Sequence, residues 1–196
     1  GQAPYTVIVT DGTNNYTATG TSPLSISVNP SATSTYSISS ITGGIAGSFS
    51  GTATVTVNQA VEVAVSVDGT NALPATPGGG STTICANSAY AMTLLAINQG
   101  TGPMTFVYNL RENNISGTIL EGNVSSGPIA AGGTIYSAAA GELTAGTYFI
   151  ETLSITDANG CQVQPVVVGA GYYNHTLVVN QAVEVAVSVD GTNALP

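Results

Sequence analysis

The sequence predicts an all-β protein built from tandem β-sandwich modules. Helix signals are almost absent, whereas apolar and polar residues alternate along most of the chain. Val61, Val63 and Val65, for example, alternate with Glu62 and Ala64. Strands with this alternation bury one face and expose the other. Many short strands separated by turn residues favour a sandwich of two sheets.

The individual strands follow from this alternation and from the turns between them. The tetrapeptide DGTN occurs at residues 11–14, 68–71 and 190–193, and DANG occurs at residues 157–160. Asp-Gly and Asn-Gly supply the positive φ angles that tight hairpins need. Residues 74–80, PATPGGG, are expected to form a loop or hinge. The predicted strands lie near residues 4–10, 15–19, 24–29, 35–42, 52–58, 61–67, 90–97, 104–111, 117–121, 133–138, 147–156, 163–168 and 174–180.

An identical block, VNQAVEVAVSVDGTNALP, occurs at residues 57–74 and again at residues 179–196. Such repeats mark an array of modules, and the chain is expected to be a window on a longer repetitive protein. A module is expected to end at NQA, and the next to begin at the valine that follows. This predicts an incomplete module over residues 1–60, a complete module over residues 61–182, and the first strand of a third module over residues 183–196.

The incomplete module and the additional strand suggest how copies could assemble. A sheet that lacks its first strands has exposed edges and an uncovered core, and a free strand can add to such an edge. We therefore hypothesise that residues 183–189 of one copy, with Val183, Val185, Val187 and Val189 on one face, occupy the incomplete module of a second copy. The alternative is a continuous polypeptide that needs no such exchange.

Composition and charge argue against several classes of partner. The chain has a single Lys or Arg residue, Arg111, and a net charge of −9. Binding to nucleic acid or to an anionic membrane surface requires basic residues, so neither is expected. No apolar run approaches the roughly 20 residues of a membrane helix, so membrane insertion is not expected. We expect no cofactor.

Cys85 and Cys161 are the two cysteines of the chain. In a chain that lacks Lys and is rich in Thr and Ser, they favour an exported protein with a disulfide over a metal-binding pair. Closing the loop between them would stabilise the fold by roughly 4 kcal/mol in the chain-entropy model. Two buried free thiols are the alternative.

The segments YTVIVTDGTNNYTATGTSPLSISVNPSATSTYSISSIT, GTATVTVNQ, TTICANSAYAMTLLAI and GTYFIETLSITDANGCQ resemble the secreted tandem Ig-like repeats of Bacteroidota-type proteins. The resemblance implies Ig-like Greek-key modules and a role in surface adhesins, gliding adhesins among them, or extracellular filaments. It also implies that Cys85 pairs with Cys161 of the DANGC turn. Residues 1–60 depart from the pattern, because Gly43, Gly44 and Ile45 stand where DANGC would be.

Several tyrosines are candidates for structural or binding roles. Tyr36 and Tyr148 each follow a Thr at the start of a predicted strand, which fits the tyrosine corner of Greek-key sandwiches. A second group could stack on surface glycans, although the chain has no Trp. This group consists of Tyr90, Tyr108, Tyr172 and Tyr173.

The charged side chains favour structural roles over catalysis. The Asp residues at 11, 68, 157 and 190 are explained by turn formation, with a Ca²⁺ site between modules, including Glu62 or Glu184, as the alternative. His175 is the sole His and would make a poor metal site. Four Glu residues are expected to keep exposed strands soluble rather than to form a glycosidase pair. These are Glu112, Glu121, Glu142 and Glu151.

Four asparagines lie in N-x-S/T sequences and are candidate glycosylation sites: Asn15, Asn114, Asn123 and Asn174. The function expected from these features is that of a non-enzymatic structural repeat in an extracellular fibre or cell-surface adhesin. Its partner would be further copies of itself, with surface glycans as a second candidate. The alternative is an accessory carbohydrate-binding module of a secreted enzyme.

Overall fold

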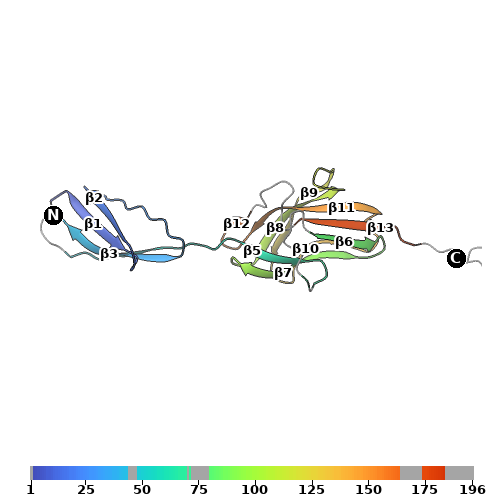
Figure 1. The fold of residues 1–196 in the computed structure, drawn as a ribbon, viewed down its shortest axis with the longest axis horizontal. Coiled ribbons are helices and arrows are strands. Elements are labelled where there is room, and N and C mark those ends of the chain that lie inside the picture. Colours follow the sequence, from blue (N-terminus) through green and yellow to red (C-terminus); the bar gives the residue numbers. More distant parts are fainter. Residues whose placement is uncertain (1, 44–47, 70, 72–79, 164–173, 184–196) are drawn as a thin grey trace, which may run out of the picture. The chain divides into compact units, whose positions relative to one another are not determined.

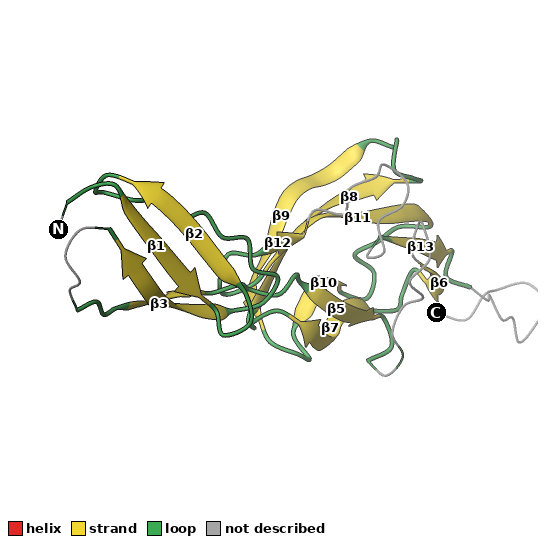
Figure 2. Ribbon diagram, turned by 60° about the vertical axis from the view of Figure 1, so that its left-hand side comes forward, coloured by secondary structure: helices red, strands yellow, loops and turns green. Residues whose placement is uncertain are grey.

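The computed structural model describes residues 2–43, 48–69, 71, 80–163 and 174–183 (Figure 1). These residues are all-β, contain no helix and form three sheets that are mostly antiparallel (Figure 2). The chain divides into two compact units, residues 1–58 and 59–196. The boundary between the units thus lies after Asn58, whereas the repeated block predicted a boundary after Ala60. In the described part of the chain no helix suited to crossing a membrane is found.

The first unit is a single antiparallel sheet of four strands in the order β2-β1-β3-β4. Its strands are β1 (Tyr5–Thr10), β2 (Asn15–Gly20), β3 (Ser34–Thr42) and β4 (Thr52–Val55). The β1–β2 hairpin closes through the first DGTN turn, in which Gly12 has a φ of 93°. The positive φ predicted for this turn is confirmed.

The second unit contains two sheets. A three-stranded sheet has the order β10-β7-β5, and a six-stranded sheet has the order β6-β13-β11-β8-β9 with β12 paired to β11. All pairs are antiparallel except β13 with β6. The strands are β5 (Glu62–Ser66), β6 (Gly80–Cys85), β7 (Tyr90–Gln99), β8 (Met104–Glu112), β9 (Ile119–Ile129), β10 (Thr134–Ala138), β11 (Gly146–Thr156), β12 (Gln162–Val163) and β13 (His175–Asn180).

The apolar faces of these two sheets meet in one core, and Figure 2 shows the two layers. Met92 and Leu94 of β7 are fully buried, as are Phe106 of β8, Ile150 of β11 and Leu177 of β13. On β13 and in the first five residues of β8, buried and partly buried residues alternate, as the sequence predicted. The second unit therefore has the covered core that a two-layer β fold requires.

The predicted strands differ from the structure at three places. β9 covers Ile119–Ile129, whereas a strand was predicted only near residues 117–121. Of the predicted strand 163–168, residues 164–168 lie outside the described residues. Residues 24–29, predicted as a strand, show the expected alternation of exposure but pair with no strand in the described part of the chain. Conversely, β6 lies just after the segment interpreted as a hinge and was not predicted. It pairs in parallel with β13, so its partner comes from the far end of the unit and leaves no local sequence signal.

Phe106 provides a direct test of the core. Because its side chain is fully buried between the two sheets, Phe106→Ala should lower the free energy of unfolding by about 3–5 kcal/mol. Ile119→Ala is a matched control on the neighbouring strand β9, since Ile119 is 48% exposed; it should change stability by less than about 0.5 kcal/mol. Urea denaturation measures both, and equal effects would contradict the core assignment.

Candidate functional site

The sheet of the first unit has one polar and one apolar face. Strand register places Thr6 opposite Thr19 and Thr35 opposite Thr54 on the polar face. The hydroxyls of these pairs lie 2.9 Å and 3.0 Å apart. The opposite face carries the apolar side chains of the four strands except Ile8, which lies on the polar face: Tyr5, Val7, Val9, Tyr16, Ala18, Tyr36, Ile38, Ile41, Ala53 and Val55.

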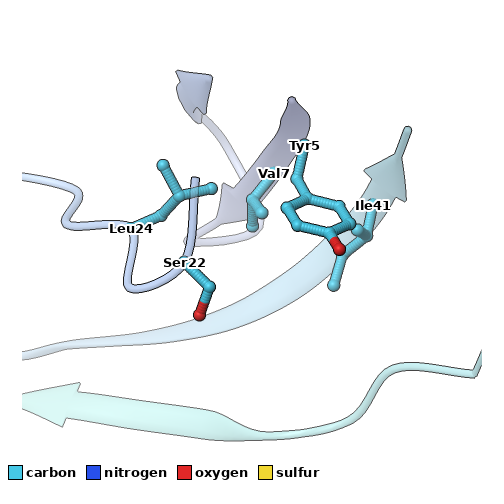
Figure 3. Close-up of a pocket in the computed structure, with 5 residues that line it drawn as sticks. All are labelled: Tyr5, Val7, Ser22, Leu24 and Ile41. Atoms are coloured by element: carbon cyan, nitrogen blue, oxygen red, sulfur yellow. The ribbon is translucent and has the colours of Figure 1, made fainter. Parts of the chain in front are cut away.

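This apolar face is poorly covered. Among the described hydrophobic residues of the first unit, Tyr36 alone is buried, whereas Ile41 is 39% exposed. A hollow of about 400 Å³ opens on the face and is lined by Tyr5, Val7, Ser22, Leu24 and Ile41. In Figure 3, Leu24 and Ser22 lie on one side of the hollow and Tyr5 and Ile41 on the other.

The sheet of the first unit has a counterpart in the second. The strand order β2-β1-β3-β4 corresponds to β9-β8-β11-β13, and all of these pairs are antiparallel. A cis X-Pro bond precedes β1 at Ala3–Pro4 and precedes β8 at Gly102–Pro103. Tyr36 and Tyr148 are each the third residue of the corresponding strands β3 and β11. Each unit therefore contains a four-stranded sheet with the same strand order.

The counterparts differ in burial. Tyr5 and Val7 of β1 correspond to Met104 and Phe106 of β8 when Pro4 is aligned with Pro103. Met104 and Phe106 are fully buried, whereas Tyr5 and Val7 are partly exposed. The sheet β10-β7-β5 covers the face in the second unit. The described residues of the first unit contain no such second sheet.

The repeated block places identical valines in different surroundings. Val61, in its first copy, is 6% exposed and belongs to the core of the second unit, as do Val63 and Val65. Val183, the equivalent of Val61 in the second copy, is 87% exposed. The other candidate assembly residues, Val185, Val187 and Val189, lie outside the described residues.

The expected Cys85–Cys161 disulfide is not present: both cysteines are free. Cys85 ends β6 opposite Asn180, beside the end of β11 that starts at Gly146. Cys161 packs beside the other end of β11, where its N–H donates to Asp157. The eleven residues of β11 span roughly 33 Å, and a disulfide needs Cα atoms within about 7 Å. The pairing predicted from the sequence is therefore incompatible with this fold.

The two candidate corner tyrosines make different contacts. The hydroxyl of Tyr148 donates to the carbonyl oxygen of Thr144, four residues upstream, at 3.1 Å. The buried hydroxyl of Tyr36 has no hydrogen-bond partner among the described residues, and its ring instead meets the edge of Tyr16. The backward hydrogen bond that defines a tyrosine corner is thus seen at Tyr148 and not at Tyr36.

The tyrosines considered for stacking on glycans do not form an exposed platform. Tyr90 and Tyr108 are each 5% exposed and belong to the core, so neither ring is available to a sugar. Tyr172 and Tyr173 lie outside the described residues.

His175 is a core residue. Its Nε2 lies 3.0 Å from the hydroxyl of Thr82 on β6, and its ring stacks on Tyr90. The side chain is fully buried, and burial lowers its pKa from 6.5 to about 4. His175 is therefore neutral at pH 7 and links β13 to its neighbours.

The carboxylates of Asp11 and Asp157 accept hydrogen bonds from backbone N–H groups. Asp11 accepts hydrogen bonds from the backbone N–H groups of Thr13 and Asn14, which lower its pKa to about 2. Asp157 accepts from the N–H of Thr101, which is the main cause of its lowered pKa, and from the N–H of Cys161. Within the described ranges, no group of three or more His, Cys, Asp and Glu side chains could hold a metal ion. The alternative of a Ca²⁺ site at Asp190 or Glu184 falls outside these ranges.

Arg111, the one Lys or Arg residue of the chain, forms an ion pair within the second unit. Arg111 Nε donates to Glu151 Oε2 at 2.7 Å, and Asn109 donates to the same oxygen at 2.8 Å. Arg111 also donates to the carbonyl oxygen of Gly117. Both charged side chains are mostly buried. This network ties β8 to β11, so Glu151 has a structural role.

The four candidate glycosylation sites differ in accessibility. Asn15, Asn114 and Asn123 are exposed. Asn174 is 3% exposed, and its side-chain oxygen accepts a hydrogen bond from the N–H of Thr152. A glycan on Asn174 would therefore be incompatible with the folded second unit.

The remaining feature, the uncovered apolar face, is the candidate functional site. The sequence predicted an uncovered core in this unit, but not that Ser22, Leu24 and Ile41 line a hollow in it. The alternation of Leu24, Ile26 and Val28 was visible in the sequence, although it was interpreted as a paired strand.

Comparison with known proteins identifies no family. No family model matches the chain, and no curated protein matches it. The described residues are all-β and form several mostly antiparallel sheets.

The state of the cysteines can be tested by alkylation. Under native, non-reducing conditions, two thiols per chain should react with iodoacetamide, and exposed Cys85 should react faster than partly buried Cys161. Peptide mass spectrometry reports the modified sites. Recovery of a peptide joined through Cys85 and Cys161 would contradict the structure.

His175 predicts a loss of stability in mild acid. The unfolded chain takes up a proton near pH 6.5, whereas the folded chain takes it up only near pH 4. Because the unfolded state binds more protons between these values, stability should decrease as the pH falls from 6.5 to 4. Urea midpoints measured over this range should fall in the wild type and change less in His175→Gln. An equal slope in both proteins would exclude this role of His175.

Proposed function

We propose that this protein is a non-enzymatic structural repeat that builds an extracellular fibre or cell-surface adhesin from tandem Ig-like modules. The observation that carries the proposal is the position of the repeated block at both ends of the second unit. In the first copy, Glu62 pairs with Gln99. Gln99 lies two residues before Thr101, whose N–H donates to Asp157, the residue that follows β11. The first copy therefore lies at the Thr156 end of β11. The second copy leaves from Asn180, at the Gly146 end of β11.

Opposite ends matter because they set the geometry of an array. A module whose chain enters at one end and leaves at the other adds length with each repeat. The β11 strand alone has eleven residues, which corresponds to roughly 33 Å. The shared sheet order of the two units and the equivalent positions of Tyr36 and Tyr148 support a common module plan.

The chemistry of the polar side chains is compatible with a structural role. Arg111 is bound to Glu151, His175 is buried, and Asp11 and Asp157 hold their own turns. These groups stabilise strands and hairpins. Self-association through β modules is the proposed mode of action, and the cell surface or extracellular space is the proposed location.

The array geometry can be tested by adding repeats. The full chain is extended by one, two or three copies of residues 75–196, so that each addition completes the preceding block as a new module. Small-angle X-ray scattering and negative-stain images should show the longest dimension rising by at least about 33 Å for each added copy. Compact particles whose longest dimension rises only as the cube root of mass would contradict the proposal.

A further inference from the structure

A segment with alternating exposure, residues 24–30, lies beside the uncovered face of the first unit. Along residues 24–30, partly buried residues alternate with exposed ones: Leu24, Ile26 and Val28 are partly buried, and Ser25 and Ser27 are exposed. Leu24 lines the hollow together with Tyr5, Val7 and Ile41 (Figure 3). Within the described residues this segment pairs with no strand. Its backbone is therefore available to a partner strand, as at a sheet edge.

The second unit shows what occupies the equivalent place. Residues 24–30 lie in the chain between β2 and β3, as β10 lies between their counterparts β9 and β11. β10 pairs with β7 in antiparallel fashion, and β7 places the fully buried Met92 and Leu94 in the core. The first unit has the apolar face and the counterpart of β10. It lacks, in the described residues, a strand at the position of β7.

The chain carries a segment suited to this position. Residues 183–188 have the same sequence as residues 61–66, whose last five residues form β5. In that first copy the alternating valines are 3–6% exposed, so the sequence is able to form a strand that buries one face. In the second copy, Val183 is 87% exposed. Burial of valine side chains is favourable, so covering the valines of the second copy and the apolar face of the first unit with each other is favoured.

We infer that residues 183–189 of a second copy add as an antiparallel strand beside residues 24–29 and cover the hollow with Val183, Val185, Val187 and Val189. This inference rests on the proposed role in self-assembly, and it names the partner and the acceptor site. Backbone hydrogen bonds to residues 24–29 supply affinity, and the valine face supplies specificity. The strand takes the position that β7 holds beside β10.

Charge is compatible with this contact. Residues 1–58 carry one charged side chain, Asp11, and residues 183–189 carry one, Glu184. Glu184 alternates with the valines and therefore faces solvent when they face the sheet. Because apolar burial and backbone hydrogen bonds dominate, association should depend little on salt concentration.

The first test is the association state of the full chain. Sedimentation velocity should show dimers and longer species that increase with protein concentration. The double variant Val185→Asp and Val187→Asp should weaken association by about tenfold or more, because it places charges against an apolar face. The control is Ala186→Asp and Ser188→Asp, which adds the same charge to the opposite face of the strand and should associate like the wild type.

Three outcomes would overturn the inference. A chain that remains monomeric at all concentrations, valine variants that associate like the wild type, and control variants that lose association equally each contradict it. None of these results bears on the length increments of the extended arrays, so the tandem-array part of the proposed function is tested separately from strand addition.

A second measurement locates the acceptor. The chain has no Trp, so Ile41→Trp places a single fluorescent reporter in the hollow. The peptide VEVAVSVDG, identical to residues 183–191, should shift its emission to shorter wavelength as the indole becomes covered. The peptide VEDADSDDG should cause no shift. An unchanged spectrum with the first peptide, or equal shifts with both, would exclude this site.

Discussion

The structure depends on one constraint, namely that a sheet with one apolar face must have that face covered. In the second unit the sheet β10-β7-β5 covers the face of β9-β8-β11-β13, and Phe106, Ile150 and Leu177 are fully buried as a result. In the first unit the same sheet order occurs with a partly exposed face. Burial of apolar surface is favourable by roughly 25 cal/mol for each Å², so covering the exposed face of the first unit favours association.

Much of the fold could be predicted from the sequence, because half-buried strands and Asp-Gly turns leave local signals. The alternation of Val61, Val63 and Val65 predicted β5, and the positive φ at Gly12 and Gly69 agrees with the predicted turns. The unpaired state of residues 24–29 could not be predicted, because alternation reports burial on one side and says nothing about a pairing partner. The parallel pairing of β6 with β13 was hidden for a related reason, since it joins segments far apart in the chain.

The candidate site was predicted in outline but not in detail. The repeated block indicated an incomplete first module, whereas the hollow between Leu24 and Ile41 required the three-dimensional arrangement. The prediction of a Cys85–Cys161 disulfide was wrong, because the two cysteines lie near opposite ends of the eleven-residue strand β11. The sequence alone does not show at which end of a strand each cysteine lies. The burial of Tyr90 and Tyr108 shows the same limitation, because an aromatic side chain on a strand can face the core or the solvent.

If a strand of a second copy covers the first unit, hydrogen–deuterium exchange of the full chain should detect it. At low concentration, the backbone amides of residues 24–29 should exchange rapidly, because no strand pairs with them. As concentration rises, exchange should slow in residues 24–29 and 183–189 together, with little change in β8 or β11 of the second unit. Exchange in residues 24–29 that is independent of concentration would contradict the account.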